Sequence, residues 1–364
     1  MMKCAAFCAT LLFTITLSAQ TSRVPEPQYV AIDSKDNVFV ALKYGIIKIT
    51  PDGTLTNLTK QAGTIGDLDR TWKNLIIDSK DNLYANDGKI IYRFNFSSDG
   101  KFVGKLFTGQ LYTYKLEDGP IATAGFNTID SMVIDRNDNI YVTDSFVKIK
   151  DTIGTNFVTD PFYAAAPAKT RGSADYHVIR RIGRDGNVIT LKASDGKYIV
   201  PNNIFKMAID AAGNLIYTSH GRYVGRINLV TGAFTNLVGQ PYKREYCPVY
   251  TQGAVATAEL FTPENLIINK QGNIIFADQR IHRLIKIADG KVSTLAGNGM
   301  IDSCSRNIGG WAQEGNKDGK ALTALFNFPQ GMAYDSKGNL YIADMSNHSI
   351  RKLSPDGMVT TFAK

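Results

Sequence analysis

The most regular feature of the chain is a six-fold alternation of apolar and polar positions. In each copy a short apolar segment ends in Asp or Asn, and a tight turn leads into a second segment rich in aromatic and β-branched residues. A third segment reads apolar, any residue, Lys or Arg, apolar, and a Gly-containing turn leads to a fourth. Period-two alternation indicates β-strands, so each copy predicts four antiparallel strands. The first segments are YVAID (29–33), NLIID (74–78), SMVID (131–135), KMAID (206–210), NLIIN (265–269) and GMAYD (331–335).

Six four-stranded units in series predict an all-β fold, a six-bladed β-propeller with antiparallel blades. A lone four-stranded sheet leaves both faces open, whereas six sheets packed around an axis cover one another and keep only short edges. We expect a single propeller over residues 20–364, closed by packing of blade six on blade one without exchange of a strand. The blades are expected at approximately 27–60, 72–108, 129–193, 204–239, 263–297 and 329–364.

Residues 1–19 have the pattern of an export signal. Lys3 precedes an apolar run that is too short to span a bilayer, and small residues follow up to Ala19. Cleavage near Ala19 predicts an exported protein, periplasmic or extracellular, which we expect to be a monomer with no membrane span. The cysteines beyond this segment are Cys247 and Cys304, and the sequence leaves open whether they form a disulfide or remain two thiols.

The overall charge and the short motifs exclude some classes of function. The formal net charge of +8 is a modest excess that suits acidic glycans, anionic surfaces or nucleic acid, and it bears on encounter rather than on fold. Because the protein is expected to be exported, we expect no nucleic-acid partner. The chain has no H-E-x-x-H, G-x-S-x-G or P-loop motif, so the sequence gives no support to nucleophilic catalysis or nucleotide chemistry.

The segment SKGNLYIADMSNHSIRKL (336–353) resembles an NHL repeat, the motif named for Asn-His-Leu, with Ser349 in the third place. The longer phrase that starts with STLAGNG at Ser293 is typical of secreted bacterial NHL propellers, and the resemblance covers nearly all of 24–364. Blades one, two and four depart from the motif because they lack its histidine. The implied fold is similar to that of SMP-30/gluconolactonase-like enzymes and the peptidylglycine amidating lyase, whereas NHL modules themselves mostly bind protein or RNA.

Residues at the start of each innermost strand are expected to line the mouth of the central channel. The resemblance to the amidating lyase implies zinc-binding histidines at these places, and none is found there, so we do not expect lyase chemistry. The six places carry Gln28, Lys73, Asp130, Phe205, Glu264 and Gln330.

The resemblance to the lactonases instead implies Glu, Asn and Asp at this rim, around one divalent cation. Asp130 and Glu264 match in type and are the metal-ligand candidates, and Gln28 and Gln330 would add neutral oxygens for a hard cation such as calcium. Such a cation would polarise a lactone carbonyl or activate water. Lys73 puts a positive charge at the same rim, so the alternative is that both acids are structural and one of them pairs with Lys73.

Three histidines, His177, His282 and His348, share one repeat position before the third strand of blades three, five and six. Three histidines suggest zinc. The repeat position, however, places them at a similar radius outside the central channel, and the three blades are not all neighbours. We therefore expect a capping or packing role.

Three insertions, 145–176, 239–261 and 297–326, lie outside the regular strands. Long loops on a rigid scaffold are common places for recognition. The last two are equivalent loops of adjacent blades, and a Cys247–Cys304 disulfide would join them into one lid. Their aromatic and basic residues suit sugar or peptide binding, with loop packing as the alternative. The candidates are Tyr242, Lys243, Arg244, Tyr246, Tyr250 and Trp311.

The leading functional hypothesis is an exported binding module that takes a polypeptide or a glycan through the rim loops of blades three to six. The alternative is a metal-dependent hydrolase of the SMP-30/gluconolactonase type at the channel mouth. The two differ in one requirement, because the hydrolase needs a stoichiometric cation and loses activity in Glu264→Gln.

Overall fold

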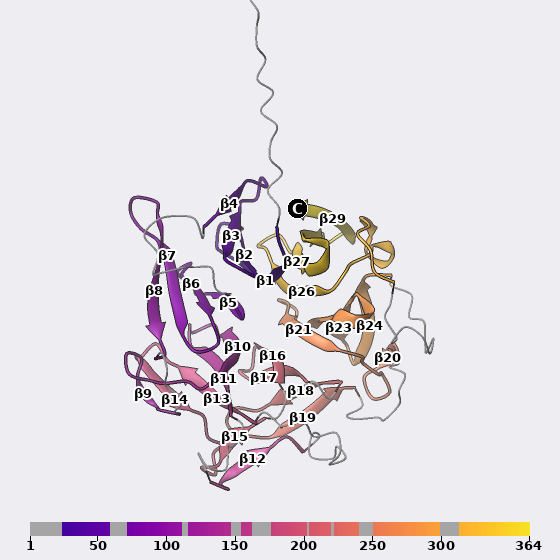
Figure 1. The fold of residues 1–364 in the computed structure, drawn as a ribbon. Coiled ribbons are helices and arrows are strands. Elements are labelled where there is room, and N and C mark those ends of the chain that lie inside the picture. Colours follow the sequence, from indigo (N-terminus) through magenta and orange to yellow (C-terminus); the bar gives the residue numbers. More distant parts are fainter. Residues whose placement is uncertain are drawn as a thin grey trace, which may run out of the picture.

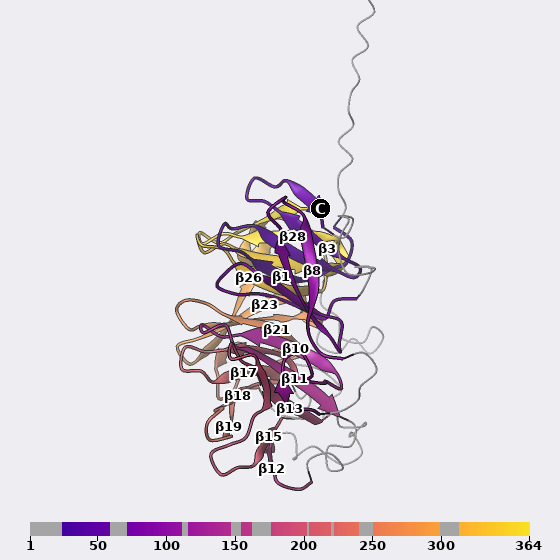
Figure 2. The same ribbon diagram turned by 90° about the vertical axis from the view of Figure 1, so that its left-hand side faces the viewer.

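The structure, a computed structural model, describes residues 24–58, 71–110, 116–146, 154–161, 176–201, 204–219, 222–239, 250–298 and 313–364. These residues form six antiparallel sheets arranged around one axis (Figure 1). Seen from the side, this ring of sheets has the shape of a disc (Figure 2). The chain is therefore an all-β, six-bladed β-propeller, as its repeats predict.

In blades one to three the strands follow sequence order from the axis outward (Figure 1). Blade one contains β1 (Pro27–Ile32), β2 (Val38–Leu42), β3 (Ile46–Ile49) and β4 (Leu55–Asn57). Blade two contains β5 (Asn74–Ile77), β6 (Leu83–Asn86), β7 (Ile91–Phe96) and β8 (Phe102–Thr108). Blade three contains β10 (Ile129–Ile134), β11 (Ile140–Phe146), β13 (Tyr176–Ile182) and β14 (Asn187–Thr190).

Blades four to six repeat this order. Blade four contains β16 (Ile204–Ile209), β17 (Leu215–Ser219), β18 (Tyr223–Ile227) and β19 (Phe234–Val238). Blade five contains β21 (Pro263–Ile268), β22 (Ile274–Asp278), β23 (Arg283–Ala288) and β24 (Lys291–Ala296). Blade six contains β26 (Pro329–Tyr334), β27 (Leu340–Asp344), β28 (Ser349–Leu353) and β29 (Met358–Ala363).

The structure adds short elements that the sequence pattern treats as loop. Three two-residue strands, β9 (Gly119–Pro120), β20 (Gly253–Ala254) and β25 (Gly319–Lys320), pair with the outer edges of blades three, five and six and so cover part of each exposed edge. A parallel pair joins β12 (Phe157–Thr159) to β15 (Tyr198–Val200). Three 3₁₀ turns are η2 (Gln279–Ile281), η3 (Ala321–Thr323) and η4 (Met345–Asn347), and no helix in the described ranges is long and apolar enough to cross a membrane.

The hydrophobic core lies in layers between neighbouring blades. The alternating strands turn apolar side chains toward both adjacent sheets, and one large buried cluster fills each of the six interfaces. The cluster between the two ends of the chain packs Val30 and Val40 of blade one against Tyr341 and Ile350 of blade six. Within the described residues no strand is exchanged between these two blades, so packing closes the ring as expected.

Each innermost strand ends in a turn built by its last Asp or Asn. Oδ1 of Asp33 accepts hydrogen bonds from the backbone N–H of Asn37 at 2.8 Å and of Lys35 at 3.0 Å, and Oδ2 accepts from Asn37 Nδ2 at 2.7 Å. The bond to the backbone four residues on recurs in every blade, which explains the Asp/Asn-x-x-x-Asn spacing of the repeat.

Serine–aspartate pairs join some of these turns across blade boundaries. In each pair, which we call a latch, a serine hydroxyl and its own backbone N–H both donate to one aspartate of the next blade, at 2.6–2.9 Å. At the other three boundaries glycine replaces the aspartate, at Gly213, Gly272 and Gly338. The latches are Ser34–Asp81, Ser79–Asp138 and Ser336–Asp36.

Buried arginines fix the connections that lead into blades three and six. Arg351 is fully buried and donates to Asp344 at 2.8 Å, to Asp318 at 2.6 Å and to the carbonyl oxygens of Leu325 and Lys317. Arg180 makes the same set of bonds in blade three. Blade five has an isoleucine at this position, so it fixes its connection without a buried charge pair.

Candidate functional site

The channel mouth is shaped by irregular pairing at the start of the innermost strands. The register of β10 against β11 shifts between Ile129 and Ser131, and β1, β16, β21 and β26 show the same irregularity near their first residues. A bulge bends a strand and re-aims its side chains, and bulges are frequent beside binding sites. The shifts fall on the residues that the sequence assigned to the mouth.

A cavity of about 350 Å³ opens at this place. This volume lies in the range of small-molecule sites. Five of the six predicted mouth residues line it, while Gln28 is half-buried in β1 and is not among its lining residues. The lining residues are Tyr29, Lys73, Asp130, His177, Ile204, Phe205, Lys206, Glu264, Asn265 and Gln330.

Asp130 is the firmly ionised acid of the cavity. Its Oδ1 lies 3.4 Å from Lys73 Nζ, and its Oδ2 lies 3.5 Å from Nε2 of the buried His177. Burial alone disfavours the charged carboxylate, but hydrogen bonds from His177 and Ser145, with the charge of Lys73, outweigh it and lower the pKa of Asp130 to about 2. One of the two rim acids therefore pairs with Lys73, which is one part of the alternative raised from the sequence.

Glu264 behaves in the opposite way. Burial, followed by the charge of Asp278, raises the pKa of Glu264 to about 7, and the positive charges of Lys206 and Arg280 only partly oppose this. The cavity therefore holds one carboxylate that is ionised at any ordinary pH and one carboxyl group that exchanges its proton near neutrality. Such a pair can accept hydrogen bonds at one place and donate at another.

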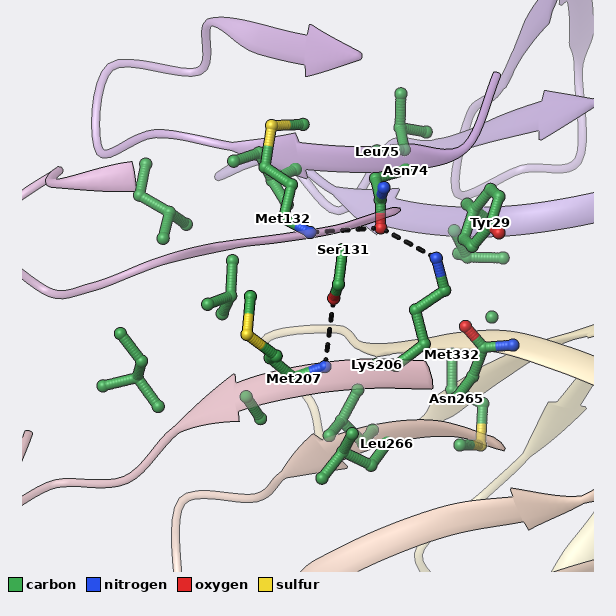
Figure 3. A pocket seen from close by; sticks show the side chains of 18 of the residues that line it. Tyr29, Asn74, Leu75, Ser131, Met132, Lys206, Met207, Asn265, Leu266 and Met332 are labelled. Atoms are coloured by element: carbon green, nitrogen blue, oxygen red, sulfur yellow. Dashed lines mark hydrogen bonds between the residues drawn. The ribbon is translucent and has the colours of Figure 1, made fainter. Parts of the chain in front are cut away.

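Lys206 closes the floor of the cavity. It starts from β16, and its ammonium group donates to the carbonyl oxygens of Lys73 and Asp130 and to Oδ1 of Asn74, each at 3.0 Å. Figure 3 shows the side chain reaching toward Asn74, beside the ring of Tyr29, whose centroid lies 4.6 Å from Nζ. Below it a second space of about 290 Å³ continues down the channel between the innermost strands.

Lys206 is not among the mouth residues predicted from the sequence, although the repeat contains a signal for it. Aligning the six apolar segments by their first letters places Lys206 in one column with a set of mostly polar residues, and all of them line the channel. A charged side chain at an inward-facing repeat position indicates a special role, because buried charges need partners. The other members of the column are Tyr29, Asn74, Ser131, Asn265 and Gly331.

The donor set around the acids does not suit a calcium ion. Calcium takes about six to eight oxygen ligands. Asp130 instead faces Lys73 and His177, and the ammonium of Lys206 contacts its carbonyl oxygen. Within the ranges that the structure describes, no group of three or more His, Cys, Asp or Glu residues is placed to hold a metal ion.

The three repeat-position histidines divide into two kinds. Nδ1 of His282 accepts from the backbone N–H of Phe328, and Nδ1 of His348 accepts from that of Glu26, so each caps the entry to the next blade as expected. His177 differs, and its expected place outside the channel is wrong. It lies within β13, paired with Ser145 of β11, and it lines the mouth cavity beside Asp130.

Of the loop candidates, Tyr250 lies within the described residues. Tyr250 is 8% exposed, and its hydroxyl group hydrogen-bonds with Thr294 Oγ1 at 3.1 Å, so its side chain packs in the apolar cluster between blades four and five. The remaining candidates lie outside the described residues: Tyr242, Lys243, Arg244, Tyr246, Cys247, Cys304 and Trp311.

The fold and the cavity define a class of protein, a six-bladed β-propeller with a polar cavity on its axis. The family model of the NHL repeat matches residues 326–353, so the part of blade six from β26 to β28 is an NHL repeat. The chloroplastic Protein SUPPRESSOR OF QUENCHING 1 of Arabidopsis thaliana is 37% identical over 100 residues, which are 27% of this chain and 8% of that protein. The chain thus spans under a tenth of that curated relative.

Solved structures share the fold at low sequence identity. An auxiliary nutrient binding protein from Bacteroides thetaiotaomicron superimposes with a TM-score of 0.60 at 14% identity, covering 93% of this chain and 70% of that one. A gluconolactonase from Xanthomonas campestris superimposes with a TM-score of 0.52 at 11% identity, covering 93% of this chain and 88% of that one. Both likenesses concern the fold.

Proposed function

We propose that this protein is an exported binding propeller that takes a polar ligand, a glycan or a polypeptide segment, at the channel mouth. The observation that carries this proposal is the open cavity of about 350 Å³ that gathers side chains from blades one to six. Saccharide and peptide ligands are rich in hydrogen-bonding groups, and the cavity offers partners for both donors and acceptors.

The individual side chains suit such a ligand. Lys73 is 40% exposed and supplies a positive donor, and Asp130 is 29% exposed and supplies an ionised acceptor. Gln330 adds an amide whose oxygen already accepts from Asn265 at 2.8 Å. Phe205 adds an aromatic side chain to the wall. Mixed polar groups beside an aromatic ring favour a glycan over an extended peptide.

The loops at 239–261 and 297–326 extend the proposal to the rim of blades four to six, where the sequence places further aromatic and basic residues. A nutrient-binding role for a fold neighbour supports a binding function for this chain as an analogy only. The export signal and a monomeric state belong to the same proposal.

A binding screen with a matched variant tests the proposal. The protein comprising residues 20–364 is screened against glycan and peptide arrays, and hits are measured by calorimetry for the wild type, Asp130→Asn, and the control Asp185→Asn, whose carboxylate is exposed in a turn of blade three. We expect at least a tenfold loss of affinity in Asp130→Asn and none in the control. Equal binding by all three proteins, or no ligand in either array, would refute the proposal.

Elemental analysis of the same preparation separates this proposal from the metal-dependent hydrolase. One equivalent of calcium in the wild type, lost in Glu264→Gln, together with lactone hydrolysis that disappears in that variant, would favour the hydrolase. The donor set described above leads us to expect neither result.

A further inference from the structure

The three oxygens that hold the Lys206 ammonium come from two neighbouring blades other than its own. The carbonyl oxygen of Lys73 and the amide oxygen of Asn74 belong to blade two, and the carbonyl oxygen of Asp130 belongs to blade three. Lys206 itself belongs to blade four, and the Tyr29 ring beside its Nζ belongs to blade one. The ammonium group therefore lies within the channel and contacts residues of three blades besides its own.

Bonds other than those to Lys206 hold these oxygens in place. Asn74 Nδ2 donates to the carbonyl oxygen of Asp130 at 3.2 Å, and Asn74 Oδ1 accepts from the backbone N–H of Met132 at 3.3 Å. The backbone N–H of Lys73 donates to the carbonyl oxygen of Asn86 at 2.9 Å. The oxygen cluster is thus fixed by contacts between blades two and three, and Figure 3 shows Asn74 bonded both to the backbone of Met132 and to Lys206.

We propose that the ammonium group of Lys206 is the propeller's own channel cation, and that it fills a preformed three-oxygen site which would otherwise take a free monovalent cation. The channel mouth then needs no metal ion to carry a positive charge on its axis. Lys206 occupies this site at the floor of the cavity whichever ligand binds above it.

The chemistry of the donors selects an ammonium or monovalent ion over a divalent one. A lysine ammonium group has three donors, and each finds one oxygen at 3.0 Å. All three oxygens are neutral, whereas hard divalent cations in proteins are held with the help of carboxylates. The face of Tyr29 adds a cation–π contact, which favours a poorly hydrated cation.

A tethered cation also has two consequences for the cavity. Its charge stands below Glu264 and lowers the pKa of that group against the effect of burial. Its side chain also lies at the boundary between the mouth cavity and the rest of the channel, because Lys206, like Tyr29 and Asn265, lines both spaces. A ligand at the mouth therefore meets a fixed positive floor.

Chemical rescue tests the proposal. Lys206→Ala empties the site, and thermal unfolding is measured at an ionic strength of about 0.1 M, which equalises screening, in the chloride salts of tetramethylammonium, potassium or n-propylammonium. We expect a lower Tm in Lys206→Ala, with at least half of the loss restored by n-propylammonium and part by potassium, but none by tetramethylammonium. The wild type and the matched control Lys286→Ala, a lysine on β23 away from the channel, should show no such selectivity.

Two results of these unfolding measurements would overturn the proposal. The first is that Lys206→Ala has the same Tm as the wild type. The second is that the Tm of Lys206→Ala differs among the three salts no more than the Tm of Lys286→Ala does. A second measurement covers the case in which Lys206→Ala does not fold. In the wild type, the side-chain ¹H–¹⁵N signal of Lys206, assigned by its loss in Lys206→Met or Lys206→Arg, should persist at neutral pH because all three protons are bonded. A signal lost to solvent exchange, as for exposed lysines, would contradict the inference.

Discussion

Replacing Arg351 by isoleucine should destabilise blade six strongly, and blade five shows how to test the reason. Blade five has Ile285 where blade six has Arg351, Asp278 in place of Asp344, and Gln252 in place of Asp318. Oε1 of Gln252 accepts from the backbone N–H of Thr294, just as Asp318 accepts from that of Thr361. Blade six therefore fixes the connection that leads into it with a buried arginine–aspartate pair, and blade five does so without one.

The size of the effect follows from what Arg351→Ile leaves behind. The Arg351 and Asp344 side chains are both 0% exposed, and the arginine also satisfies two backbone carbonyl oxygens. Removing one partner of a buried ion pair costs about 3–5 kcal/mol, because the remaining charge has lost its partner. Arg181→Ile is the matched control, since Arg181 is 34% exposed and lies 3.9 Å from an exposed aspartate, where about 0–1 kcal/mol is expected.

The loss should also depend on pH. Burial already raises the pKa of Asp344, and the arginine acts against this rise. A carboxyl group whose folded-state pKa exceeds its unfolded value contributes stability at low pH and loses it as the pH rises through the folded-state pKa. Without Arg351 the pKa of Asp344 rises further, so the loss should be larger at about pH 8 than at about pH 5.

Urea unfolding of the wild type, Arg351→Ile, Arg181→Ile and the double variant Arg351→Ile/Asp318→Gln measures these free energies at both pH values. The double variant recreates the blade-five arrangement and should recover part of the loss. A loss below about 1 kcal/mol, as small as that of an exposed pair, or the same loss at both pH values, would show that the buried pair does not carry the stability assigned to it.

Three further predictions address the site and the blade boundaries. Burial raises the pKa of Glu264 to about 7, so wild-type Tm should fall as the pH rises through neutrality, and Glu264→Gln should flatten this part of the profile measured by calorimetry. Ser79→Ala removes the hydroxyl donor of one latch and should cost about 0.5–1.5 kcal/mol in urea unfolding, whereas Ser194→Ala, outside any latch, should cost less. Gly331→Ala would put a Cβ atom 2.6 Å from the Cα of Tyr29, so it should cost about 1–3 kcal/mol by calorimetry by forcing blade six away from blade one, and a neutral effect would show that the boundary yields.

The architecture was predictable because the same four-strand pattern occurs six times in the sequence. Every copy has the same spacing of turn residues, as in the Asp33–Asn37 pair, and the same alternation of apolar and polar positions in its strands. Closure of the ring follows because the first and last blades present matching apolar faces. The positions of Asp130 and Glu264 at the mouth were also predictable from the repeat, since five of the six residues at the start of the innermost strands line the cavity.

The details of the site were less accessible because they depend on contacts between blades. The sequence around Lys206 does not show that its ammonium group binds oxygens of Lys73 and Asp130, which lie 133 and 76 residues back in the chain. His177 shares its repeat position with His282 and His348, yet the longer pairing of β11 with β13 places it at the mouth. Repeat position gives the radius of a residue only where the local hairpin is regular.

The junction between the two ends of the chain has a consequence for engineering. It has a complete apolar cluster, a serine–aspartate latch from Ser336 to Asp36 and a histidine cap from His348 to Glu26, so it is built like the boundaries inside the chain. The contacts within the ring therefore do not distinguish the blade that comes first in the sequence from the others. A circular permutant that joins residue 364 to residue 24 through a short linker and opens in another surface turn, such as Ser97–Lys101, should keep the same closed ring.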